Sequence, residues 1–221
     1  MKGMKNLIIL CLLLSSLTAL ASTPVGYYNQ GSLIDGECMP EEGDGFVQLY
    51  RAVGHYWGTT EMIDMLERTA SDMARRYPNR DRMQIEDISA RDGGDIDPHG
   101  SHENGLDVDI QYFKADGRES DERLGYAKPM VNNGSVSSNF DVERNWEMVK
   151  ALHRNGRVQM IFMDQKLQDA LISYARSKNE YGSHLKEIQS LRHVANHQDH
   201  LHVRLLCPPT AKGCFSRTKK R

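Results

Sequence analysis

Two segments that lie far apart in the chain concentrate side chains that bind metal ions. The first histidine segment is residues 97–109 (DPHGSHENGLDVD), and the second histidine segment is residues 197–202 (HQDHLH). His200 and His202 stand two apart in a run that alternates like a β-strand, so both should point to one face. If the two segments are neighbours in one sheet, His102, Asp109 and His202 can offer two imidazoles and a carboxylate to one divalent ion. Three protein ligands and one open position are typical of a catalytic zinc site.

The distribution of histidine favours a metal site over a set of structural residues. Six of the nine histidines lie in residues 99–102 and 193–202. A single histidine is usually a hydrogen-bonded structural residue, whereas His-x6-Asp together with His-x-His has the composition of a zinc-binding set. We therefore expect one Zn²⁺ per chain.

The same segments resemble a known family of enzymes. Residues 100–110 (GSHENGLDVDI) and residues 197–208 (HQDHLHVRLLCP) are similar to motifs of the penicillin-insensitive murein endopeptidases. A weaker similarity runs from about Cys38 to the C-terminus. A sparser pattern, His-x6-Asp followed by His-x-His, is shared with a wider group of metallopeptidases that includes lysostaphin and the D-alanyl-D-alanine peptidases.

The resemblance implies separate roles for the histidines of the second segment. It makes His202 the metal ligand and His200 a catalytic neighbour, which acts on the attacking water or on the developing oxyanion. His197 would assist His200, either by holding a tautomer or by stabilising the tetrahedral intermediate.

Two further polar residues of the first segment have open roles. Asp107 shares a strand face with Asp109 and is expected to orient a ligand from behind. His99 has two interpretations: it orients a ligand in the same way, or it takes part in an accessory metal site.

The function implied by the resemblance is that of an exported zinc endopeptidase. Its substrate would be peptidoglycan, and the bond cleaved would be the cross-link between D-alanine and meso-diaminopimelate. Because no serine nucleophile takes part, β-lactams should not acylate such an enzyme. The alternatives are a D,D- or L,D-carboxypeptidase of the same metal architecture and an inert metal-binding wall protein. Retention of His200 beside His202 argues against the inert protein, since a structural zinc site is more often closed by four protein ligands.

Residues 1–21 have the pattern of a secretory signal peptide. Lys2 and Lys5 precede the apolar run 7–14, and residues 19–21 (ALA) supply small side chains at the two cleavage positions. The apolar run is shorter than the ~20 residues that a membrane-spanning helix needs. We therefore expect a periplasmic or secreted protein with no membrane anchor after cleavage.

The charge of the exported chain argues against a nucleic-acid partner. Removal of residues 1–21 takes away two lysines and no acidic residue, so 26 basic residues remain against 30 acidic ones and the formal charge is −4. A nucleic-acid-binding protein normally carries a clustered basic surface. The expected partner is therefore cross-linked peptidoglycan.

Three cysteines remain after export. Cys207 and Cys214 flank a short loop, and a disulfide between them would hold the segment that follows the second histidine segment. The resemblance favours the same pair. Cys38 then has no evident partner and is expected to be a free thiol or to form an intermolecular bond.

The hydrophobic pattern predicts one α+β domain over residues 22–221, with an extended arm at 22–44. Helices are expected from Thr59 or Thr60 to Tyr77, from Val142 to Asn155, and after Asp164. Strands are expected at residues 83–88, 107–112, 158–162 and 200–205, and a polar loop with a turn at 132–135 fills residues 114–140. The expected architecture is a small antiparallel sheet that carries the metal site, with helices packed against its other face.

Overall fold

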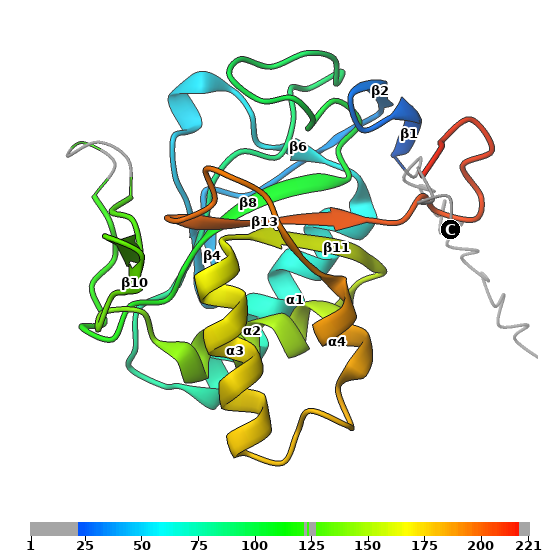
Figure 1. Cartoon of the computed structure of the whole chain (residues 1–221). Helices are drawn as coiled ribbons and strands as arrows, with labels where there is room; N and C mark the ends of the chain where they lie inside the picture. The colour runs from blue at the N-terminus through cyan, green and yellow to red at the C-terminus, as the bar shows by residue number, and fades with distance from the viewer. Residues whose placement is uncertain (1–21, 122, 124–126, 217–221) are drawn as a thin grey trace, which may run out of the picture.

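A mixed β-sheet forms the centre of the protein in the computed structural model, which describes residues 22–121, 123 and 127–216 (Figure 1). The expected signal peptide at residues 1–21 lies outside the described residues. Within the described residues the sheet has seven strands in the order β12-β11-β13-β8-β7-β5-β4. Their bounds are β4 Glu42–Gly43, β5 Phe46–Gln48, β7 Met83–Ile85, β8 Asp107–Gln111, β11 Val158–Met163, β12 Leu191–His193 and β13 His200–Leu205.

The strands around the two histidine segments are antiparallel. β13 pairs antiparallel with both β8 and β11, and β8 pairs antiparallel with β7. Parallel pairs occur only further out among the described strands, between β11 and β12 and between β5 and β7. The expected α+β class is confirmed.

Four α-helices are described, and Figure 1 shows them gathered on one side of the sheet, while loops cover the other side. Side chains cap the N-termini of three of these helices. For example, Thr59 accepts a hydrogen bond from the Met62 N–H, and Asp164 accepts one from the Lys166 N–H. No described helix is long and apolar enough to cross a membrane. The helices are α1 Thr60–Arg76, α2 Val142–Asn155, α3 Gln165–Ser177 and α4 Leu185–Ser190, and the 3-10 helix η1 is Arg51–Val53.

Strand β8 separates the core from the site by its alternation. Val108 and Ile110 are fully buried in the hydrophobic core, where they join residues of the helices such as Trp146. Asp107 and Asp109 alternate with them and point to the opposite face of the sheet. The period-two pattern of the sequence therefore places both carboxylates on the face that the loops cover.

Residues 22–44 contain more regular structure than the expected arm. β1 (Thr23–Tyr27) and β2 (Gln30–Ile34) form a hairpin, and β3 (Glu37–Cys38) pairs with β6 (Trp57–Gly58). The Glu103 carboxylate accepts a hydrogen bond from the Gly31 N–H at 3.0 Å, so the first histidine segment fixes the hairpin beside the site.

The polar segment 114–140 also contains a hairpin. β9 (Val131–Asn132) and β10 (Ser135–Val136) pair antiparallel, and the turn between them uses Asn133 and Gly134, both with positive φ. Asn-Gly is the sequence that a two-residue hairpin turn of this kind favours. The hairpin is tied to the second histidine segment because the Met130 N–H donates to the Gln198 carbonyl at 2.6 Å.

Candidate metal centre

The two histidine segments meet on neighbouring strands. The register of β13 against β8 places His202 opposite Asp109 and Arg204 opposite Asp107. His102 comes from the loop that precedes β8. The three residues predicted as ligands therefore lie together, at the sheet face opposite to Val108 and Ile110.

Three ligand atoms converge with the spacing that a small divalent ion requires. His102 Nε2 lies 3.2 Å from His202 Nδ1 and 3.5 Å from Asp109 Oδ1, and His202 Nδ1 lies 3.2 Å from Asp109 Oδ1. Tetrahedral zinc with bonds of about 2.0 to 2.1 Å holds its ligand atoms about 3.3 Å apart. The observed distances fit that geometry.

In the His102 and His202 rings, the far nitrogen, which points away from the three converging atoms, has a hydrogen-bond partner, and this partner shows that the near nitrogen is free to bind a metal. His102 Nδ1 lies 2.8 Å from the Ile88 carbonyl oxygen, and His202 Nε2 lies 2.7 Å from Asp107 Oδ1. A carbonyl and a carboxylate can only accept, so these two nitrogens donate. In neutral rings, the lone pairs of His102 Nε2 and His202 Nδ1 then face each other and Asp109. Such a set of acceptors suits a bound cation.

The charges around His102 and His202 also favour a bound cation. Asp109 Oδ1 is buried and has no hydrogen-bond partner among the described residues. Burial opposes its charged form, yet the neighbouring His102 and His202 hold the pKa of Asp109 well below its usual value. Burial likewise lowers the pKa of His202, but Asp107 and Asp109 outweigh burial and raise it. Two carboxylates thus stabilise a positive charge at this point, either a proton or a metal ion.

The loop before β8 holds His102 in an unusual backbone conformation. His102 has φ 72° and is fully buried, and Gly105 has φ 71°. A Cβ at Gly105 would lie 3.0 Å from the Thr59 backbone nitrogen and would strain the same loop. A bulky non-glycine residue in the left-handed region costs energy, and such residues cluster at functional sites.

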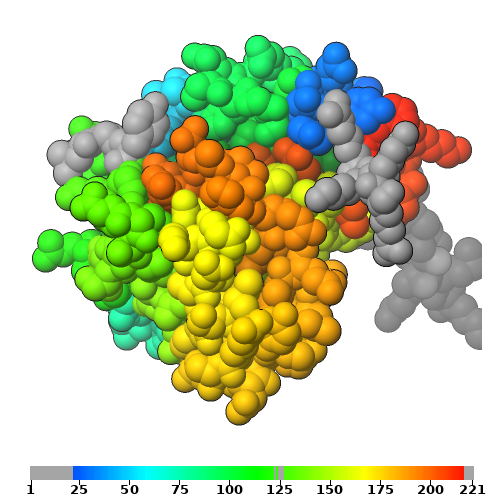
Figure 2. All heavy atoms as spheres, viewed as in Figure 1, coloured from blue at the N-terminus to red at the C-terminus, as the bar shows by residue number. Residues whose placement is uncertain are grey.

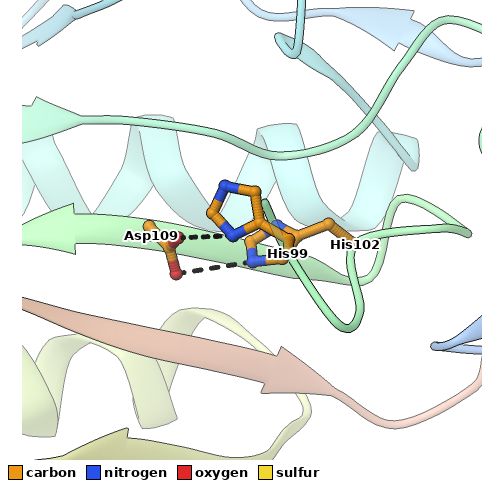
Figure 3. Close-up of side chains that lie close together, drawn as sticks. All are labelled: His99, His102 and Asp109. Atoms are coloured by element: carbon orange, nitrogen blue, oxygen red, sulfur yellow. Dashed lines mark ion pairs between the residues drawn. The ribbon is translucent and has the colours of Figure 1, made fainter. Parts of the chain in front are cut away.

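His99 lies on the other side of the same carboxylate. Its Nδ1 is 3.6 Å from Asp109 Oδ2, and its Nε2 is 2.9 Å from Asp87 Oδ2. Ligand atoms of His99, His102 and Asp109 all lie within 4.8 Å of one another (Figure 3). Figure 3 shows His99 and His102 pointing from one loop toward the two oxygens of Asp109. The structure is therefore compatible with both roles expected for His99.

The site opens into a cleft of about 550 Å³. The orange segment that links α4 to β13 lies at the surface between the yellow helix α3 and the green loop before β8 (Figure 2). The cleft is lined by residues of the turn between β1 and β2, of the loop before β8, of β8 and β11, of the segment before β13 and of β13 itself. They are Tyr28, Pro98, His99, Gly100, Ser101, Asp109, Phe162, Val194, Ala195, Asn196, His197, His200, His202 and Arg204.

His200 and His197 both line this cleft but have different partners. His200 Nε2 is 3.9 Å from Asp109 Oδ1, and its Nδ1 lies 2.8 Å from Asp199 Oδ1. His197 Nδ1 lies 2.9 Å from the Ala195 carbonyl oxygen, and burial lowers the pKa of His197. Among the described residues the hydrogen-bond partner of His200 Nδ1 is thus Asp199.

A family model for penicillin-insensitive murein endopeptidases matches residues 24–221. The chain belongs to this family. A relative of that name from Haemophilus influenzae is 26% identical over 199 residues, which are 87% of this chain and 66% of the relative. One from Klebsiella pneumoniae is 24% identical over 233 residues, which are 96% of this chain and 81% of the relative. One from Escherichia coli O157:H7 is 23% identical over 229 residues, which are 95% of this chain and 81% of the relative.

This member of the murein endopeptidase family has a buried ion pair behind its site. Arg204 Nε and His202 Nε2 both donate to Asp107 Oδ1, at 2.6 and 2.7 Å. Burial opposes the charge of Asp107, but Arg204 and His202 lower its pKa to about 2. The Arg204 guanidinium stacks on the Tyr28 ring at 3.4 Å. Asp107 therefore lies within hydrogen-bond distance of His202, where it can orient the ring.

Sequence reasoning did not single out Asp87, Asp199, Arg204 or Tyr28. Asp87 and Tyr28 reach the site from elsewhere in the chain, so no local spacing marks them. Asp199 precedes His200 directly, and that adjacency of a carboxylate and an imidazole was the available signal. Arg204 follows His202 by two positions, so the two side chains share one face of the strand, and this spacing was the available signal for Arg204.

A disulfide holds the C-terminal part of the described chain in this family member. Cys207 and Cys214 are bonded, with their Cα atoms 5.7 Å apart. The Gly26 N–H donates to the Gly213 carbonyl at 2.8 Å, so the disulfide loop also contacts the N-terminal hairpin. Cys38 is exposed and free.

Proposed function

We propose that this family member is a zinc peptidase whose ion is held by His102 Nε2, Asp109 Oδ1 and His202 Nδ1. The observation that carries the proposal is the convergence of these three atoms within 3.2 to 3.5 Å. The hydrogen bonds from the far ring nitrogens to Ile88 and Asp107 support it, since they leave the near nitrogens as electron-pair donors.

The substrate we propose is cross-linked peptidoglycan, and the bond is the cross-link between D-alanine and meso-diaminopimelate. The names of the relatives support murein as the substrate. The resemblance of residues 100–110 and 197–208 supports this bond. An open cleft of about 550 Å³ beside the proposed ligands is suited to an extended peptide.

A bound divalent ion would polarise the scissile carbonyl and acidify the attacking water. Burial lowers the pKa of His200, but the hydrogen bond with Asp199 and the charge of Asp109 outweigh burial and raise it to about 9. A bound ion would offset this charge of Asp109. The residues of the chain supply position and proton transfer. Asp107 and Arg204 hold the His202 ring, and the loop at Gly105 holds His102.

His200 is the proposed general base. The attacking water gives a proton to His200 Nε2 while its oxygen adds to the carbonyl carbon. The proton then passes from Nε2 to the leaving nitrogen, and the C–N bond breaks to give a carboxylic acid, which keeps the second hydrogen of the water, and an amine. His197, whose ring centroid is 5.0 Å from that of His200, would face the tetrahedral intermediate from the same wall.

We also propose that the protein is exported and acts in the periplasm or outside the cell. Peptidoglycan lies there, and residues 1–21 have the pattern of a signal peptide. The disulfide between Cys207 and Cys214 is consistent with an oxidising compartment.

Digestion of purified cross-linked peptidoglycan followed by mass analysis tests this function. An endopeptidase converts cross-linked muropeptide dimers into monomers, and a chelator should stop the reaction until Zn²⁺ is restored. Release of terminal residues alone would identify a carboxypeptidase. Intact dimers after prolonged digestion with the zinc-loaded protein would contradict both activities.

A further inference from the structure

We propose that Asp199 is a positioning residue that holds His200 in the tautomer required of a general base. The Asp199 carboxylate lies 2.8 Å from His200 Nδ1 and can only accept, so Nδ1 carries the hydrogen. In the neutral ring Nε2 then has a free lone pair. That nitrogen lies on the side of Asp109 Oδ1, 3.9 Å away, where the reaction would take place.

The backbone on either side of Asp199 is fixed, which keeps the carboxylate in place. The His197 carbonyl accepts from the Asp164 N–H at 3.0 Å and from the Tyr112 hydroxyl at 3.1 Å. The Gln198 carbonyl accepts from the Met130 N–H at 2.6 Å. After Asp199, the chain enters β13 at His200 and pairs with β8. The Asp199 side chain therefore approaches His200 from a segment held at both ends.

The partner of His200 differs in charge from that of His197. His197 donates to a neutral carbonyl, whereas His200 donates to a carboxylate. A carboxylate orients the imidazole and also stabilises the imidazolium that forms when the ring takes a proton, as in catalytic Asp-His pairs. Of the two histidines, His200 is thus the one equipped to accept a proton. This inference rests on the proposed role of His200 as the base.

The tautomer can be measured directly, without reference to activity. In ¹⁵N-histidine-labelled, zinc-loaded protein, long-range ¹H–¹⁵N correlation spectra distinguish a ring protonated at Nδ1 from one protonated at Nε2. The His200 signals are assigned from their absence in His200→Gln. At a pH where the ring is neutral, we expect the hydrogen of His200 on Nδ1. A hydrogen on Nε2 in the unaltered protein would overturn the proposal, whatever any variant does.

Substitution tests whether Asp199 is the cause. In Asp199→Ala the His200 hydrogen should move to Nε2, and kcat on a cross-linked muropeptide dimer should fall at least about tenfold while KM and zinc content change little. Asp64→Ala removes an exposed carboxylate from helix α1 and is the matched control. An Asp199→Ala protein that keeps the Nδ1 hydrogen, or that matches the control in kcat, would contradict the proposal.

The result also separates this inference from the proposed function. If the His200 tautomer depends on Asp199 but the protein does not cleave peptidoglycan, the positioning by Asp199 is supported and the proposed function is refuted. Normal cleavage with a tautomer independent of Asp199 would support the proposed function and refute the role of Asp199.

Discussion

His202 donates its Nε2 hydrogen to Asp107 across two neighbouring strands, at 2.7 Å. Asp107 is fully buried and receives a second hydrogen bond from Arg204 through the same oxygen. The orientation of the His202 ring, and with it the direction of Nδ1, is thus set from behind by a carboxylate that is itself held by an arginine. Hydrogen bonds of this kind fix the tautomer of metal-binding histidines and tune their affinity.

Asp107→Asn should therefore weaken zinc binding by roughly 10- to 100-fold, because the amide is a weaker, uncharged partner for the His202 ring. Competition with a chromophoric chelator measures the affinity. Asp64→Asn, on the exposed face of α1, is the control and should bind zinc normally. An Asp107→Asn protein with the affinity of the control would show that the buried pair does not act on the metal.

His200→Ala should keep its zinc and its fold while cleavage of cross-linked dimers falls by roughly 10² to 10⁴-fold. The reason is that His200 lines the cleft but its Nε2 lies 3.9 Å from the nearer carboxylate oxygen, outside the three converging atoms. Zinc content and activity are measured on the same preparation. Loss of zinc would make His200 a ligand, and near-normal activity would pass the role of base to His197.

Removal of the disulfide should lower the free energy of unfolding by about 2 to 3 kcal/mol, because the bond closes only a short loop of the unfolded chain. The double variant Cys207→Ser/Cys214→Ser can be compared with the unaltered protein by urea unfolding. Cys38→Ser is the matched control, since Cys38 is exposed and free. Equal unfolding midpoints for the double variant and the control would contradict the expectation.

Acid should destabilise the protein in part through His153, a residue far from the metal ligands in sequence. His153 Nε2 lies 2.8 Å from Ser190 Oγ, which itself donates to a backbone carbonyl, and the buried Nδ1 has no described partner. Burial lowers the pKa of His153 to about 4 from the usual 6.5. Between pH 6.5 and about 4 the unfolded chain therefore binds a proton that the folded chain does not, so stability falls as the pH falls through this range.

The test compares unfolding of the unaltered protein and of His153→Gln at pH 7 and at pH 4.5. The loss of stability on acidification should be smaller in the variant, which has no ring to protonate. Acid release of a bound metal affects both proteins and cancels in the comparison. The same acid-induced loss in both would show that His153 does not contribute.

Local patterns in the sequence predicted the elements that present the site. The alternation in residues 107–112 and 200–205 gave each strand a polar and an apolar face, and the structure pairs these strands as β8 and β13. Thr59 and Asp164 cap the helices expected after them. These predictions succeed because each depends on neighbours within one element.

The groups behind the predicted ligands could not be found in this way. Asp87 reaches His99, and Ile88 reaches His102, only because the chain after β7 runs beside the loop before β8. The hairpin of β1 and β2 was missed because its strands are short, rich in glycine and only partly buried, so they lack a hydrophobic period. Contacts between segments depend on the packing of the whole fold, which no local spacing records.

The zinc content of the purified protein, measured by inductively coupled plasma mass spectrometry beside that of His202→Ala, tests whether the three converging atoms hold the ion. Loss of His202 Nδ1 removes one of these ligand atoms, so we expect close to one zinc per chain in the unaltered protein and sharply reduced zinc in the variant. Full zinc occupancy in a folded His202→Ala protein would contradict it.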